Sequence, residues 1–147
     1  MVKVVRSTIL PAPIEAVWEL LRDFNGHDQW HPAIATSQIE RRHDADRVGC
    51  VRKFKLTNGA ELREQLLALS DADMAYSYCL LDTPIPLLNY VSHVQLIPVT
   101  NTDDTFWQWT GSFDTPADER ATLTDMVAHD IYDAGFDAIR TTMGLEG

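Results

Sequence analysis

The chain has 147 residues, 45% hydrophobic and 23% charged, which is typical of one ordinary globular domain. Its formal net charge of −10 argues against binding to nucleic acid or to anionic membranes, because both partners would repel such a surface. The sequence shows no apolar run of the ~20 residues that a membrane span needs, no secretory signal and only two cysteines, so we expect a cytoplasmic protein with reduced thiols and no membrane insertion.

The beginning of the chain predicts one strand followed by two helices. The β-branched stretch KVVRSTIL, at residues 3–10, predicts a strand. Pro13 opens an amphipathic helix over 13–24, whose apolar residues recur at helical spacing. A second, short helix is expected at about 27–31.

From residue 34 the hydrophobic period changes to two, and short connections separate the runs, which predicts antiparallel strands. These strands are expected near 35–42, 47–57, 60–69, 74–82, 88–99 and 104–114. A long amphipathic helix over about 117–143 must then bury its apolar stripe against the sheet. The predicted fold class is α+β, a curved seven-stranded antiparallel sheet around a long C-terminal helix. We expect an internal cavity between them, enlarged by Ala134, Gly135 and Ala138.

Two charged residues interrupt the apolar alternation of neighbouring strands. In 47–57 the even positions are apolar except for Arg52, and in 60–69 they are apolar except for Glu64. A three-residue loop at 57–59, with the glycine in the left-handed conformation of a bulge, aligns the two apolar sets and places Arg52 opposite Glu64. The sequence therefore predicts an inward-facing Arg52–Glu64 ion pair.

In the same two strands, alternation also turns Val48 and Ala68 inward. Alternation in the other strands turns Leu88 inward and extends this inner face into an aromatic chamber. Trp30 is expected at the mouth of the cavity. The candidate ligand-binding residues are Trp30, Arg52, Phe54, Leu62, Glu64, Tyr78, Leu80, Tyr90, Ser92, Trp107, Trp109, Val127 and Ile131. Pockets for small molecules commonly have this composition, with apolar walls and a few convergent polar groups.

Six stretches, in this order, resemble the START/Bet v 1-like superfamily, which is also called SRPBCC. They are PAPIEAVWELLRDF at 11–24, WHP at 30–32, RVGCVRKF at 47–54, REQLLALSDAD at 63–73, NYVS at 89–92 and FDTP at 113–116. Within the superfamily, the chain is most similar to bacterial polyketide cyclase/dehydrase-type proteins and to the plant abscisic acid receptors. The resemblance implies one domain over 1–147, with a helix-grip fold around a hydrophobic cavity.

The resemblance also carries over individual pocket residues. Glu64 matches the pocket glutamate of the receptors, and Tyr90 and Ser92 match their pocket tyrosine and serine. The gate loop of the receptors, serine-glycine-leucine-proline-alanine, is replaced here by LTNGA, and their latch by DTPIPLL. The resemblance therefore extends to the pocket and not to hormone-gated inhibition of a phosphatase.

Three functions remain open on the sequence. The first is the binding of a small hydrophobic, ring-containing ligand. The second is a cyclase- or dehydratase-type enzyme with Glu64 as general acid or base and with Tyr78 or Tyr90 polarising a carbonyl group, so Glu64 and Tyr90 are the candidate catalytic residues. The third is a protein-interaction module that uses its acidic surface. A single inward carboxylate favours binding, because most acid–base mechanisms use a second titratable group.

The spacing of His27 and His31, four residues apart, resembles that of helical zinc sites. The two histidines supply only two of the three or more protein ligands that zinc requires. We therefore expect no metal and no cofactor. The expected partner is the small hydrophobic ligand alone, and the protein is expected to be a monomer or a homodimer.

Overall fold

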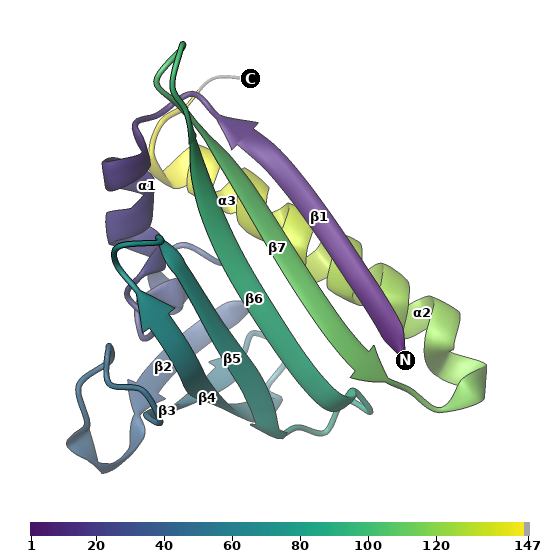
Figure 1. The fold of residues 1–147 in the computed structure, drawn as a ribbon. Helices are drawn as coiled ribbons and strands as arrows, with labels where there is room; N and C mark the ends of the chain where they lie inside the picture. Colours follow the sequence, from purple (N-terminus) through teal and green to yellow (C-terminus); the bar gives the residue numbers. More distant parts are fainter. Residues whose placement is uncertain (146–147) are drawn as a thin grey trace.

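One seven-stranded antiparallel sheet dominates the computed structural model, which describes residues 1–145 (Figure 1). The strand order is β1-β7-β6-β5-β4-β3-β2. The strands are β1 (Val2–Leu10), β2 (Ile34–Ile39), β3 (Val51–Leu56), β4 (Glu61–Ser70), β5 (Ala75–Asp82), β6 (Leu88–Val99) and β7 (Asp104–Asp114). The predicted α+β class and the antiparallel meander are confirmed.

The helices lie at the two ends of the chain. The helix α1 (Ile14–Leu21) and the 3-10 turn η1 (His27–Gln29) follow β1, and a 3-10 turn η2 (Glu40–Arg42) follows β2. The C-terminal helix runs without a break through η3 (Ala117–Glu119), α2 (Arg120–Asp125), η4 (Met126–Asp133) and α3 (Ala134–Thr142). It crosses the sheet behind β1, β7 and β6 (Figure 1). Within the described part of the chain, no helix is long and apolar enough to span a membrane.

The core lies between this helix and the inner face of the sheet, and aromatic rings fill it. Trp109 of β7 stacks on Tyr132, with ring centroids 4.4 Å apart, and Trp107 meets Phe136 edge-on at 4.6 Å. A Cβ atom at Gly135 would lie 2.7 Å from the Trp109 ring. Trp109 occupies the space above Gly135, and none of Ala134, Gly135 and Ala138 lies on the wall of the cavity described below, so the prediction that these small residues enlarge the cavity is wrong.

The C-terminal helix departs from the regular α-helical period in η4, which is π-helical. The N–H of Ala134 donates to the carbonyl oxygen of His129, five residues earlier, as is typical of a π-helix. This wider turn brings Tyr132 into the core five residues after Val127, and both side chains are completely buried. Ile131, which a regular period also turns inward, is half-buried and lies on the wall of the cavity described below.

Three predicted inward positions are wrong, and irregular backbone explains each of them. Ala68 is exposed, because the register of β4 shifts between Leu66 and Ala68. Leu88 is 51% exposed, because β6 is irregular up to Val91. Val48 is 57% exposed, because it precedes the first residue of β3. One extra residue in a strand reverses the alternation of every residue beyond it.

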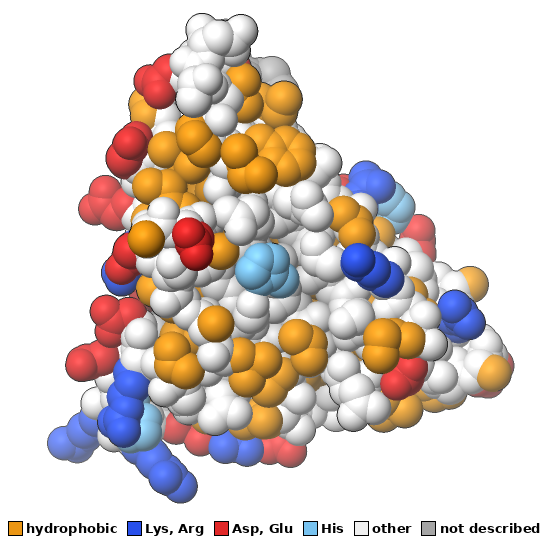
Figure 2. Space-filling model, in the orientation of Figure 1, with side chains coloured by type: hydrophobic (Ala, Val, Ile, Leu, Met, Phe, Trp, Pro, Cys, Tyr) orange, Lys and Arg blue, Asp and Glu red, His pale blue; other side chains and the backbone are white. Residues whose placement is uncertain are grey.

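The outer face of the sheet mixes apolar and polar side chains (Figure 2). Its strands expose several large hydrophobic side chains, namely Val5, Ile9, Leu67, Leu81, Val91 and Ile97. These side chains point away from the helix and from the cavity described below. They therefore provide matched controls for substitutions on the inner face.

Candidate ligand cavity

A cavity of about 250 Å³ lies between the sheet and the C-terminal helix. Apolar side chains form most of its wall, and polar groups enter it from η1, β3, β4, β5 and β6. The exposed Asn58 and Asp130 stand at its edge. Pockets for drug-sized ligands commonly measure roughly 300–1,000 Å³, so this cavity suits a small molecule with one or two rings.

Nine of the thirteen predicted ligand-binding residues lie on the cavity wall: Arg52, Phe54, Leu62, Glu64, Tyr78, Leu80, Tyr90, Trp109 and Ile131. The other four lie behind the wall. Trp30 packs against His27, with ring centroids 4.8 Å apart. Trp107 and Val127 are completely buried in the core, and Ser92 is buried behind the wall, where it accepts a hydrogen bond from Trp109.

The structure adds ten wall residues that were not among the predicted ligand-binding residues, although alternation did turn Leu56 inward. They are His27, His31, Ala33, Ile34, Leu56, Asn58, Ile85, Leu87, Met126 and Asp130. Most of them lie in turns or at strand ends, where no alternation exists to assign a face. The sequence placed Trp30 at the mouth of the cavity. In the structure the two histidines line the cavity instead, and Trp30 packs behind them.

The predicted ion pair between Arg52 and Glu64 is confirmed. The loop after β3 places Gly59 at φ 92°, and the resulting register pairs Arg52 with Glu64 and Phe54 with Leu62. Arg52 donates to Glu64 Oε1 through Nη2 at 2.6 Å and through Nε at 3.1 Å. Both side chains are buried, with residue exposures of 3% and 6%.

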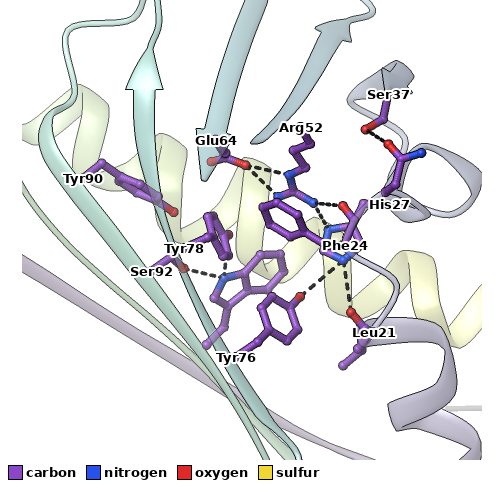
Figure 3. A network of polar contacts seen from close by, with 12 residues as sticks. Leu21, Phe24, His27, Ser37, Arg52, Glu64, Tyr76, Tyr78, Tyr90 and Ser92 are labelled. Carbon is purple, nitrogen blue, oxygen red and sulfur yellow. Dashed lines mark hydrogen bonds and ion pairs between the residues drawn. The ribbon is translucent and has the colours of Figure 1, made fainter. Parts of the chain in front are cut away.

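Arg52 also connects the sheet to the segment that follows α1 (Figure 3). Its Nη1 donates to the carbonyl oxygen of Phe24 and to Nδ1 of His27, each at 2.8 Å. The guanidinium carbon lies 4.1 Å from the centroid of the Phe24 ring, in cation–π geometry. The charge of Arg52 is thus compensated by the protein itself, before any ligand is considered.

Both wall histidines are neutral, and their ring nitrogens are already engaged. His27 Nδ1 accepts from Arg52, so its proton is on Nε2, which lies 3.3 Å from the carbonyl oxygen of Leu21. His31 Nδ1 accepts from the N–H of Ala33, and its Nε2 donates to the carbonyl oxygen of Ile131 at 2.8 Å. Burial lowers the pKa of both side chains, and Arg52 lowers it further. Among residues 1–145, no group of three or more histidines, cysteines or acidic residues is arranged to hold a metal ion.

Glu64 has one oxygen that the protein does not use. Both bonds from Arg52 end on Oε1, and no group within residues 1–145 donates a hydrogen bond to Oε2. Burial raises the pKa of the Glu64 carboxyl above its ordinary value, and the charge of Arg52 opposes this rise. A buried carboxylate oxygen on the cavity wall is a strong acceptor for a ligand that carries a donor.

Three tyrosine hydroxyls, from Tyr78, Tyr90 and Tyr132, belong to one cluster that is connected through Ser92 and Trp109. The Tyr90 and Tyr132 hydroxyls are 2.5 Å apart, and the Tyr132 hydroxyl lies 3.1 Å from Ser92 Oγ. Trp109 Nε1 donates to Ser92 Oγ at 2.9 Å and to the Tyr78 hydroxyl at 3.3 Å (Figure 3). Burial, followed by the charge of Glu64, raises the pKa of Tyr78 to about 12, so its hydroxyl stays protonated.

A comparison with protein families and solved structures agrees with this architecture. The family model described as "Polyketide cyclase / dehydrase and lipid transport" matches residues 1–144. The protein XoxI from Bacillus cereus is 27% identical, with a TM-score of 0.83 over 97% of this chain and 95% of that one. A protein from Thermobifida fusca is 25% identical, with a TM-score of 0.86 over 98% of this chain and 94% of that one.

A plant protein shares the fold at lower identity. Ginseng major latex-like protein 151, from Panax ginseng, is 13% identical, with a TM-score of 0.79 over 96% of both chains. The comparison with curated proteins finds no match.

Proposed function

Because this chain belongs to the polyketide cyclase/dehydrase and lipid transport family, we propose that it binds a small hydrophobic, ring-containing ligand in the cavity between the sheet and the C-terminal helix. The observation that carries the proposal is a buried polar pair, Arg52 and Glu64, on the wall of a mainly apolar cavity. The apolar wall favours the transfer of a ring from water, and the polar groups orient it.

Filling the cavity tests this proposal. Leu62 lies on the wall, and a tryptophan at this position would occupy part of the 250 Å³. Leu67, on the same strand, is 42% exposed on the outer face and provides the matched control. We expect Leu62→Trp to weaken the binding of a neutral aromatic probe such as benzophenone at least tenfold in isothermal titration calorimetry, and Leu67→Trp to leave it within twofold. Equal effects of the two substitutions would place binding outside the cavity.

Native mass spectrometry of the purified protein provides a second test, because a ligand acquired in the cell adds its mass to that of the chain. We expect such an adduct for the wild type and for Leu67→Trp, and its loss in Leu62→Trp. An adduct that persists unchanged in Leu62→Trp would contradict the proposed location.

Glu64 supports a second candidate function, that of an enzyme of the cyclase or dehydratase type without a metal. The supporting observation is that Oε2 is unused and that burial raises the pKa of this carboxyl, which suits a general acid or base. The neutral histidines weigh against this function, because their ring nitrogens are engaged by the protein. Turnover of a ligand identified by mass spectrometry, abolished in Glu64→Gln while binding persists, would favour the enzyme.

We also propose a cytoplasmic location. Cys50 and Cys79 are both free thiols, and free thiols are typical of a reducing compartment. Secretion of the native protein in a fractionation experiment would contradict this proposal.

A further inference from the structure

The hydrogen-bond network of the cavity has a direction, which follows from counting protons. Ser92 has one hydroxyl proton, and it is donated to the carbonyl oxygen of Thr110 at 3.1 Å, because a carbonyl oxygen only accepts. Ser92 Oγ must therefore accept from Tyr132. Since Tyr132 has then donated its own proton, its oxygen must accept from Tyr90. The chain of donors runs from Tyr90 to Tyr132, then to Ser92 and to the backbone.

This direction distinguishes the two tyrosines of the cavity wall. The proton of Tyr90 is held by Tyr132, so Tyr90 has no proton to offer a ligand. Tyr78 accepts from Trp109, and the hydroxyl nearest to its own is that of Ser92 on the adjacent strand. Ser92 Oγ already accepts from Tyr132 and from Trp109, which fills its two lone pairs, so the proton of Tyr78 has no acceptor among the described residues. Tyr78 is 2% exposed and lies on the wall, so its free proton is available only to a molecule inside the cavity.

Glu64 provides the complementary group. Its Oε2 accepts no hydrogen bond from the described residues, and Glu64 is 6% exposed on the same wall. The register pairs Glu64 with Leu80, so Tyr78 is its diagonal neighbour on the adjacent strand. Diagonal neighbours of a sheet lie roughly 7–8 Å apart, close enough for one small ligand to reach both side chains.

The charges of the cavity disfavour an anionic ligand. The charge of Arg52 is balanced by Glu64, both histidines are neutral, and Asp130 adds a negative charge at the edge. The carboxylate of an anionic ligand would therefore meet no unpaired cation on the described wall, and it would lie near the carboxylates of Glu64 and Asp130. Burial of an unpaired charge is strongly unfavourable.

We infer that the ligand is a neutral hydroxy-carbonyl compound, whose hydroxyl group donates to Glu64 Oε2 and whose carbonyl oxygen accepts from the Tyr78 hydroxyl. This inference rests on the proposed function, since it names the chemistry of the ligand that the cavity takes. It assigns the role of donor to Tyr78 and not to Tyr90.

Four matched two-ring compounds, three benzophenones and one diphenylmethane, test each half of the inference by isothermal titration calorimetry. The compound para-hydroxybenzophenone carries both groups, para-benzylphenol lacks the carbonyl, and para-methoxybenzophenone lacks the hydroxyl donor. The anion para-benzoylbenzoate replaces the hydroxyl with a carboxylate. One hydrogen bond between neutral groups changes affinity by roughly 3- to 10-fold, and a bond to a carboxylate changes it more. We therefore expect para-hydroxybenzophenone to bind roughly 3- to 10-fold more tightly than para-benzylphenol, to exceed para-methoxybenzophenone by at least as much, and the anion to bind most weakly.

Tyrosine-to-phenylalanine variants locate the donor to the carbonyl. We expect Tyr78→Phe to abolish the preference for para-hydroxybenzophenone over para-benzylphenol, and Tyr90→Phe to retain it. Tyr76→Phe is the matched control, because Tyr76 is on the same strand and face, is buried, and lies outside the cavity wall. The preference is a ratio of affinities within one variant, so a general loss of stability does not change it.

The outcomes separate this inference from the proposed function. Equal affinities across the panel, tightest binding of the anion, or loss of the carbonyl preference in Tyr90→Phe alone would overturn the inference and leave a hydrophobic cavity in place. Failure of all four compounds to bind to the wild type would overturn the proposed function and the inference together.

Discussion

Replacing Glu64 with glutamine removes the negative charge of the buried ion pair and keeps the shape of the side chain. Arg52 is 3% exposed, so water cannot take the place of the lost carboxylate. Breaking a buried pair by removing one charge destabilises a protein by about 3–5 kcal/mol. The Phe24 ring, 4.1 Å from the guanidinium carbon, offsets part of this loss. We therefore expect the free energy of unfolding to fall by about 3 kcal/mol, at the lower end of the range.

Removing Arg52 should destabilise the protein more than removing the charge of Glu64. Arg52→Met leaves the carboxylate unpaired, and it also leaves the Phe24 carbonyl and His27 Nδ1 without a donor. Each buried acceptor without a partner costs about 1–3 kcal/mol. The double variant Arg52→Met/Glu64→Gln has no unpaired buried charge, and only the Phe24 carbonyl and His27 Nδ1 remain without a donor. The effects of the two substitutions on the free energy of unfolding should therefore couple by about 2–3 kcal/mol.

Urea unfolding of the wild type, both single variants and the double variant, at pH 7, measures this cycle. A shift in the midpoint with an unchanged m-value reports stability alone. A loss of less than about 1 kcal/mol in Glu64→Gln, or additive effects in the cycle, would show that water solvates the pair and would refute the reasoning.

Three further predictions concern the histidines, the helix and the tyrosine cluster. Because folding lowers the pKa values of His27 and His31, the unfolded chain takes up protons before the folded protein does as the pH falls below about 6.5. The free energy of unfolding should therefore drop by about 2–3 kcal/mol between pH 7.5 and 5.5. The raised pKa of Glu64 opposes this drop by a small amount, because it lets the folded protein take up a proton first at that site. Urea unfolding across this pH range checks the drop, and His93→Asn, at an exposed histidine, provides the control. A free energy of unfolding that does not change with pH would contradict the burial of His27 and His31 in their neutral form. Gly135→Ala should destabilise by about 1–3 kcal/mol in thermal unfolding, because its Cβ would lie 2.7 Å from the Trp109 ring; a gain in stability, as helix propensity alone predicts, would show that the ring moves. Tyr132→Phe should cost about 1–2 kcal/mol, because Tyr90 loses its acceptor and Ser92 a donor, and an unchanged urea midpoint would contradict the donor chain.

The sequence predicted the strands well because their alternation and short turns are local features. The register of Arg52 and Glu64 followed from two apolar patterns and one glycine, so even a long-range contact was accessible. The exposed positions of Ala68 and Leu88 could not be predicted, because the bulges that reverse the alternation are fixed by pairing with neighbouring strands. No residue type marks these bulges in the sequence.

On the C-terminal helix, the sequence missed a core residue for a similar reason. A regular α-helical period does not turn Tyr132 toward the sheet, whereas the π-helical turn of η4 brings it into the core, and the predicted Ile131 still lies on the cavity wall. The direction of the hydrogen-bond chain depends on Tyr132, so the distinction between Tyr78 and Tyr90 was out of reach of the sequence. Loop residues such as Ile85 and Leu87 line the cavity without any periodicity to indicate it.

The most direct test of the central claim, a ligand inside this cavity, is a methyl NMR titration with para-hydroxybenzophenone. We predict shifts for the methyl groups of Leu62, Leu80 and Ile131 on the cavity wall, and none for Leu67, Leu81 and Ile97 on the outer face. Shifts confined to the outer-face methyl groups, or no shifts at saturating probe, would contradict the account.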